Sequence, residues 1–179
     1  TVVNGGTDPI TPQIRVFAWE QNANEDALAP TTALVASPPM AVIPPGQSQT
    51  VRLVRVDKAR ATAEEHYRLL VDEITDRAAD ATSGVALQLR YSVPVFVRPN
   101  ARDVANLTLT AEVASDSLRI DASNSGGAHA QVSNISLAYG DGSSVVVGAG
   151  LVGYVLPTKN RQWTIALPPE ALGRRNPQS

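Results

Sequence analysis

The chain has 179 residues, of which 43% are hydrophobic, 18% charged and only 4% aromatic, which is enough for one large or two small domains with packed cores. Seventeen acidic and fifteen basic residues leave a net charge of −2, so no global charge attracts the chain to nucleic acid or to an anionic membrane. The sequence contains no cysteine, which excludes disulfide scaffolds, thiol nucleophiles and cysteine-based zinc sites.

The first half of the chain has a hydrophobic period of two, with short apolar runs separated by proline, glycine, asparagine and aspartate. This pattern is typical of an all-β sandwich, in which alternate side chains face the core. Residues 14–20 carry apolar side chains on both faces, as a central strand does, and residues 50–56 and 67–71 predict two further strands. Residues 75–84 contain no large apolar side chain, so we expect a mobile loop there.

The longest predicted strand comprises residues 85–97. It places seven apolar side chains on one face: Val85, Leu87, Leu89, Tyr91, Val93, Val95 and Val97. Pro94 has the opposite parity, and its missing N–H indicates a bulge or an edge strand. Since sandwich strands usually have about five or six residues, the extra length fits one long core strand or a strand end that pairs with another chain. The pattern favours neither.

Residues 98–101 have the composition of a linker, and the sequence after them is richer in serine, asparagine and glycine. We therefore expect a domain boundary after residue 100. The second half predicts five further strands, at residues 107–113, 118–120, 130–139, 144–147 and 162–167.

Two short motifs have ordinary explanations. Residues 148–153 match GxGxxG, but a dinucleotide site needs a helix that begins at those glycines, and the pattern continues as a strand until Pro157. Glu64, Glu65 and His66 offer metal ligands, but the other histidine is far along the chain and no spaced histidine pair supports a site. We interpret these residues as a solvated approach to the following strand.

The basic run of Arg52, Arg55, Lys58 and Arg60 contains no interleaved aromatic residues. We interpret it as a solvated strand end rather than a nucleic-acid site. Hydroxyl side chains are abundant, but the sequence has no GxSxG motif and neither histidine lies in a recognisable catalytic motif. The sequence therefore predicts a protein that is not an enzyme and that holds no cofactor or metal.

Five stretches carry a resemblance: ASPP at 36–39, IPPG at 43–46, VRL at 51–53, YRLLVDEI at 67–74 and RYSVPVFVRP at 90–99. Together they resemble the periplasmic pilus-assembly chaperones of the PapD-like family. The last stretch and GYVLP at 153–157 are most similar to its archaic, spore-coat-like branch. The resemblance implies two immunoglobulin-like β-sandwich domains, residues 1–100 and 101–179. The family's first strand is absent from the chain, so we expect N-terminal strands to be missing from the first domain.

The resemblance also implies a function in fimbrium biogenesis, with pilus subunits (pilins) and an outer-membrane usher as partners in the periplasm. In this family the chaperone stabilises a subunit by donor-strand complementation, which is a form of strand addition. By resemblance, the residues that fill the subunit's groove are Val85, Leu87 and Leu89, together with Tyr91. An immunoglobulin-like cell-surface adhesion module is the alternative, although an adhesin would not need an overlong apolar strand after a mobile loop.

The family's remaining site residues match this chain only in part. The family anchors the subunit's terminal carboxylate with an arginine on its first strand, which is absent here, and with a lysine whose position falls on Pro94. Arg90 is the substitute candidate, because it lies on the donor strand and a guanidinium suits a carboxylate. Glu73 and Arg98 match members of the family's interdomain ion-pair network.

Overall fold

The computed structural model describes residues 1–22, 25–74 and 89–172. Of the described residues, 58% lie in strands and 3% in helix, so the predicted all-β class is confirmed. None of the helices in these described ranges is long and apolar enough to cross a membrane. The chain divides into two compact units: unit 1 comprises Thr1–Trp19, Leu28–Ala61 and Glu65–Val97, and unit 2 comprises Glu20–Ala27, Thr62–Glu64 and Arg98–Ser179.

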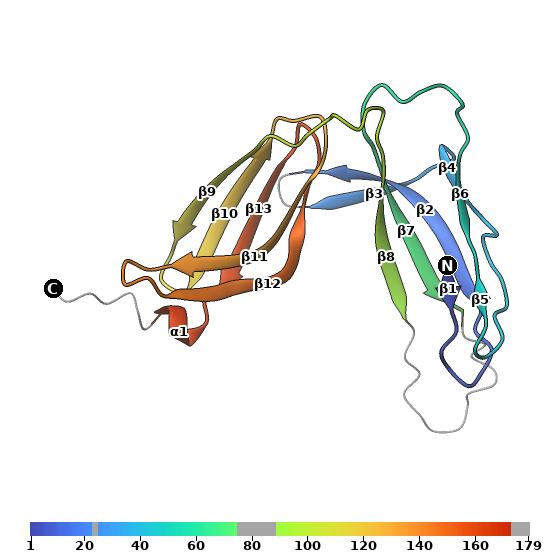
Figure 1. Cartoon of the computed structure of the whole chain (residues 1–179), viewed down its shortest axis with the longest axis horizontal. Coiled ribbons are helices and arrows are strands. Elements are labelled where there is room, and N and C mark those ends of the chain that lie inside the picture. Colours follow the sequence, from blue (N-terminus) through green and yellow to red (C-terminus); the bar gives the residue numbers. More distant parts are fainter. Residues whose placement is uncertain (23–24, 75–88, 173–179) are drawn as a thin grey trace. The chain divides into compact units, whose positions relative to one another are not determined.

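The strands of the first half form one larger antiparallel sheet and two short pairs (Figure 1). They are β1 (Val2–Val3), β2 (Pro12–Gln21), β3 (Asp26–Pro30), β4 (Leu34–Ser37), β5 (Ser48–Gln49), β6 (Arg52–Arg55), β7 (Glu65–Glu73) and β8 (Arg90–Val97). The four-stranded sheet has the order β3-β2-β7-β8, and β1 pairs with β5 and β4 with β6. The strands predicted from residues 14–20, 50–56 and 67–71 are therefore present as β2, β6 and β7.

The two faces of the four-stranded sheet bury different side chains. On one face Ile14 and Tyr67 are buried, and on the other Trp19 and Leu70 are buried. Both faces of β2 and β7 thus contribute to packing, as expected for central strands whose apolar residues occur in both parities.

Strand β8 lies at the edge of this sheet, where its described residues pair with β7 alone. Pro94 lies opposite Arg68 in an unbroken register, so its missing N–H is tolerated because the strand is an edge and not because of a bulge. The predicted loop at residues 75–84 lies outside the described residues, as do Val85 and Leu87 of the predicted long strand.

Unit 2 contains the sheet β13-β10-β9 and the antiparallel pair β11-β12. Its elements are β9 (Leu107–Val113), β10 (Ser117–Asn124), β11 (Ala130–Ala138), β12 (Ser144–Val155), β13 (Asn160–Ala166) and the short helix α1 (Pro169–Leu172). A cluster of buried apolar residues forms its core: Leu118, Ile120, Leu167 and Ala171. In β10 the buried positions alternate with more exposed ones, which is the period of a strand with one face on a core.

The glycines of the GxGxxG match lie within β12. Gly150 has a φ of 69° and sits where the β11–β12 register is irregular. A Cβ atom at Gly153 would lie 3.0 Å from ring atoms of Trp163. The glycines therefore allow a bulge in the strand and a close contact with the Trp163 ring. No helix begins at them, so they do not form a dinucleotide site.

Candidate functional site

The edge strand β8 exposes a row of apolar side chains. Tyr91 and Val93 of β8, and Leu89 directly before it, have exposed fractions of 59%, 44% and 51%. They share one face, and Tyr91 and Val93 lie opposite Val71 and Leu69 of β7. An unpaired strand edge with alternate apolar side chains can accept a further strand, because its backbone N–H and C=O groups still lack a neighbour on that side.

A groove of about 540 Å³ lies beside these side chains in unit 1. Its lining combines β1 and the residues after it with the ends of β7 and β8, and it includes Val2, Val3, Ile10, Pro12, Val71, Glu73, Leu89, Tyr91 and Val93. The lining is mostly apolar, which is the ordinary character of a binding groove. Glu73 is part of this lining, and the Glu73 N–H donates to the Leu89 carbonyl at 3.3 Å.

The opposite face of the same sheet holds two arginines on one carboxylate. An Nη atom of Arg15 donates to Oδ2 of Asp72 at 2.6 Å, and Nε of Arg90 donates to Oδ1. These hydrogen bonds, above all the one from Arg90, hold the pKa of Asp72 below its usual value. The Asp72 side chain is 9% exposed, whereas those of Arg15 and Arg90 are 42% and 63% exposed.

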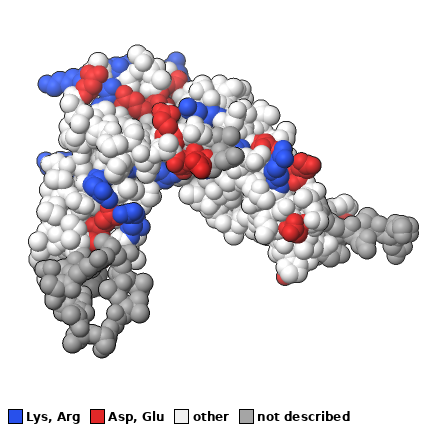
Figure 2. All heavy atoms as spheres, turned by 180° about the vertical axis from the view of Figure 1, so that it is seen from behind, with Lys and Arg blue, Asp and Glu red and all other residues white. Residues whose placement is uncertain are grey.

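This Arg15–Asp72–Arg90 cluster carries one net positive charge, because two guanidinium groups share one carboxylate. Most of the Arg90 side chain remains accessible to an anion. In Figure 2 the basic and acidic side chains of the visible face lie next to one another, so the surface shown has mixed charge. An anionic group would therefore be attracted by the charge of this local cluster and not by an extended electrostatic field of the protein surface.

Beyond this cluster, the same face of the sheet is packed with aromatic rings. The Arg68 guanidinium lies 3.7 Å from the ring centroid of the buried Trp19, and the Trp19 and Phe96 centroids are 5.9 Å apart. A cation over the face of an aromatic ring is attracted by the ring's quadrupole, so this contact is favourable. Sequence reasoning did not assign Arg15, Arg68 or Asp72 to a site; the available signal was charged residues inside otherwise apolar strands.

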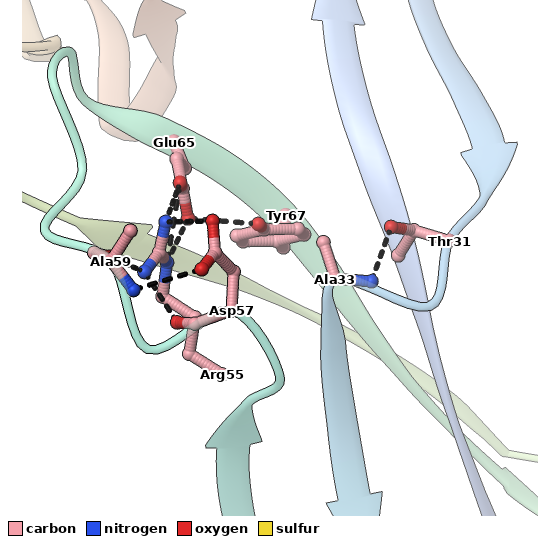
Figure 3. Close-up of polar contacts among 7 residues, drawn as sticks. All are labelled: Thr31, Ala33, Arg55, Asp57, Ala59, Glu65 and Tyr67. Carbon is pink, nitrogen blue, oxygen red and sulfur yellow. Dashed lines mark hydrogen bonds and ion pairs between the residues drawn. The ribbon is translucent and has the colours of Figure 1, made fainter.

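Arg55 forms a second cluster in unit 1 (Figure 3). Its guanidinium binds the Glu65 carboxylate with Nε–Oε2 and Nη2–Oε1 distances of 2.9 and 2.7 Å, and it also donates to the carbonyls of Asp57 and Ala59. The Tyr67 hydroxyl donates to Glu65 at 3.0 Å. The interpretation of Arg55 as solvated is therefore wrong, since its side chain is 21% exposed and ties the loop after β6 to β7.

The Arg55 cluster predicts a loss of stability in acid. The hydrogen bond from Arg55 lowers the pKa of Glu65 from 4.5, so ionised Glu65 stabilises the fold above about pH 4.5 and this contribution is lost as the pH falls through the folded-state pKa. Glu65→Gln should reduce the fall in melting temperature between pH 5 and pH 3 by about 2 °C. Asp57→Asn is the control, because it removes a carboxylate that is 66% exposed. Its thermal unfolding is measured at the same two pH values. An acid response identical in Glu65→Gln and the parent would contradict the prediction.

Tyr67 belongs to the same cluster, and its phenol affects the stability of the fold at alkaline pH. Burial, and then its hydrogen bond to Glu65, raise the pKa of Tyr67 to about 12. The neutral phenol therefore contributes stability that is complete below pH 10 and is lost as the pH rises through the higher value.

Glu64, in unit 2, is also more enclosed than the sequence indicated. It was expected to be solvated, but its side chain is fully buried. Arg98 donates to it at 3.0 Å, and both the backbone N–H and Nδ1 of His129 contact it at 2.9 and 3.0 Å. Within the described ranges no group of three histidine, aspartate or glutamate residues could hold a metal ion. Arg98 thus contacts Glu64 and not Glu73, which lies at the other end of β7. The interdomain role expected for Glu73 and Arg98 stays a prediction.

Comparison with known proteins gives a consistent result. Residues 1–103 match the family model described as "Pili and flagellar-assembly chaperone, PapD N-terminal domain". A chain in the structure of the CsuC–CsuE chaperone–tip adhesion subunit pre-assembly complex, from archaic chaperone-usher Csu pili of Acinetobacter baumannii, is 25% identical with a TM-score of 0.68. That match covers 93% of this chain and 78% of the other.

Two further structures show the same fold. The Salmonella enterica SafA pilin–SafB chaperone complex matches at 18% identity and a TM-score of 0.60, over 93% of this chain and 74% of the other. The CupB2 chaperone of Pseudomonas aeruginosa matches at 16% identity and a TM-score of 0.58, over 93% and 78%. No curated protein matches the chain.

Proposed function

Because the chain belongs to the family of pili and flagellar-assembly chaperones with a PapD N-terminal domain, we propose that it stabilises pilus subunits by donor-strand complementation and delivers them to an outer-membrane usher. The site of this activity would be the periplasm. Members of this family are not enzymes. The partner class is supported by two of the similar structures, one of a chaperone with a tip adhesion subunit and one of a chaperone with a pilin.

The observation that carries the proposal is the edge strand β8 with its exposed apolar row. Tyr91 and Val93 stand on one face of a strand that pairs, in its described residues, with β7 alone, and the exposed Leu89 directly precedes this strand. Strand addition uses backbone hydrogen bonds for generic affinity and alternate side chains for specific pockets. In the proposal, Val85 and Leu87 continue this row, as the sequence predicts.

The terminal carboxylate of the subunit would bind Arg90, with Arg15 as a second guanidinium beside it. Both arginines already bind the Asp72 carboxylate. This contact supports the proposal that they also bind the terminal carboxylate of a subunit. A guanidinium binds a carboxylate with strong, charge-assisted hydrogen bonds. Asp72 would keep the two arginines in place without cancelling their combined charge.

A pull-down from periplasmic extract, with the intact chain as bait and mass spectrometry as readout, tests the proposal. We expect small β-rich pilus subunits to be recovered. Recovery of glycans, or of no protein, would contradict the chaperone function and favour an immunoglobulin-like adhesion module.

The anchor residue can be tested separately. Arg90→Ala should weaken subunit binding about tenfold, while the melting temperature changes little because Arg15 still neutralises Asp72. Binding is measured by isothermal titration calorimetry with a subunit carrying either a free or an amidated C-terminus. The effect of Arg90→Ala should vanish for the amidated subunit. Arg52→Ala, an exposed arginine of β6, is the control, and equal binding by Arg90→Ala and the parent would overturn the assignment.

A further inference from the structure

Two polar side chains from outside the main segment of unit 2 are buried in that unit. Gln21, the last residue of β2, is 2% exposed, and Glu64, the residue before β7, is 5% exposed. Both belong to the short segments, Glu20–Ala27 and Thr62–Glu64, that form part of unit 2. Burial of a polar side chain is costly unless its hydrogen bonds are made, so the partners of these two residues show what they do.

Gln21 binds the end of strand β12. Its Nε2 donates to the Tyr154 carbonyl at 3.0 Å, and its Oε1 accepts from the Leu156 N–H at 2.9 Å. Val155 and Leu156 are completely buried. The side-chain amide thus bonds one C=O and one N–H of the strand end, as the backbone of a neighbouring strand would do.

Glu64 binds the beginning of strand β11. Its Oε1 accepts from the backbone N–H of His129 at 2.9 Å, and His129 immediately precedes β11. Its Oε2 accepts from Nε of Arg98 at 3.0 Å. A carboxylate that accepts from a guanidinium and from a backbone N–H is well compensated in a buried position.

The two contacts meet at one place in the sheet. Ala130, the first residue of β11, is the ladder partner of Val155, the last residue of β12. Gln21 therefore holds one side, and Glu64 the other, of the open end of the β11–β12 hairpin. The buried Asn124 of β10 reinforces the same place, because its Nδ2 donates to the carbonyls of Ala128 and Val155.

We infer that residues 98–179 are not a self-sufficient folding unit, and that Gln21 and Glu64 form a clamp that closes the open end of the β11–β12 hairpin. Ion pairs of Glu20 with Lys159 and of Asp26 with Arg161 hold the Gln21 segment against the same unit. The inference is independent of the proposed function.

Backbone amide hydrogen exchange, measured by NMR on the full chain, tests the clamp. Gln21→Leu removes the acceptor of the Leu156 N–H, and Glu64→Leu removes that of the His129 N–H. Each variant should lower the protection of its own amide at least about tenfold, and both should loosen the Ala130–Val155 pair. Glu64→Gln, which keeps one acceptor oxygen, should give a smaller loss at the same amide and provides a second variant if Glu64→Leu does not fold.

Matched controls come from the same two strands. Gln13→Leu changes a half-buried glutamine of β2 in unit 1, and Glu65→Gln changes the neighbouring glutamate that binds Arg55. Neither control should alter exchange at His129 or Leu156. Unchanged protection of these two amides in the clamp variants would overturn the inference. An equal loss of protection across both units would overturn it as well, because the effect would then be global and not specific to the hairpin.

Discussion

Replacement of Leu89 and Tyr91 together by aspartate is expected to abolish subunit capture while the chain stays folded. Both side chains are more than half exposed, so a carboxylate at either position remains hydrated in the free protein and costs little stability. In a complex formed by strand addition the same positions enter an apolar groove. The apolar burial is then lost, at about 1.5–3 kcal/mol for each side chain, and a carboxylate must also be desolvated.

The combined effect should exceed a thousandfold in the dissociation constant. It is measured by titration of a purified subunit, with far-UV circular dichroism and thermal melts to establish folding. Leu109→Asp is the matched control, because Leu109 is 50% exposed on strand β9 of unit 2. Retained capture by the double variant would contradict the proposed role of β8. The same change at Leu87 tests the part of the predicted strand that precedes the described residues of β8.

Replacement of Gly126 by alanine is expected to destabilise unit 2 by about 3 kcal/mol or more. A Cβ atom at this position would overlap the Val104 carbonyl oxygen and the Asn106 backbone nitrogen, and it would lie 2.8 Å from the carbonyl carbon of Ala105. All three atoms are backbone, so no side chain can turn away to make room. The Gly126 N–H also donates to the buried Asn124 side chain at 3.0 Å.

This destabilisation corresponds to a fall in melting temperature of about 6–12 °C for a chain of this size. Gly140→Ala is the control, because a Cβ atom there meets no atom within 4 Å. Denaturant unfolding of the two variants should show a lower midpoint for Gly126→Ala alone. Equal midpoints would show that the Val104–Asn106 segment moves aside at little cost.

The strand pattern was predictable from the sequence wherever one face is apolar. Residues 107–113 were predicted as a strand and form β9, because a period of two is imposed by the pleat and can be read without a structure. The sequence pattern continued as a strand up to Pro157, and β12 is present at Ser144–Val155, but its bulged pairing with β11 was not predicted. Its glycines interrupt the apolar alternation, and only the packing of Gly153 against the Trp163 ring and the bulged pairing with β11 explain them.

The polar residues were predicted less well than the strands. Arg55 and Glu64 were both interpreted as solvated, yet Arg55 is enclosed by partners within ten residues and Glu64 by partners that are distant in the sequence. Arg90 was selected for its place on β8, but its contact with Asp72 and the neighbouring Arg15 came only from the structure. A charged residue has the same local pattern whether it lies in water or against a buried partner, so single-sequence reasoning cannot separate the two.

The sequence by itself determined the all-β class, the strands with one apolar face, the choice of a bulge or an edge strand for Pro94, and the resemblance to pilus-assembly chaperones. These features depend on local periodicity, backbone chemistry and short motifs, all of which are written in neighbouring residues. Only the tertiary structure decided that Gln21 and Glu64 pack in unit 2, and that Arg15, Asp72 and Arg90 form one cluster. Those contacts join residues far apart in the chain, and their geometry exists only after the backbone has brought the strands together.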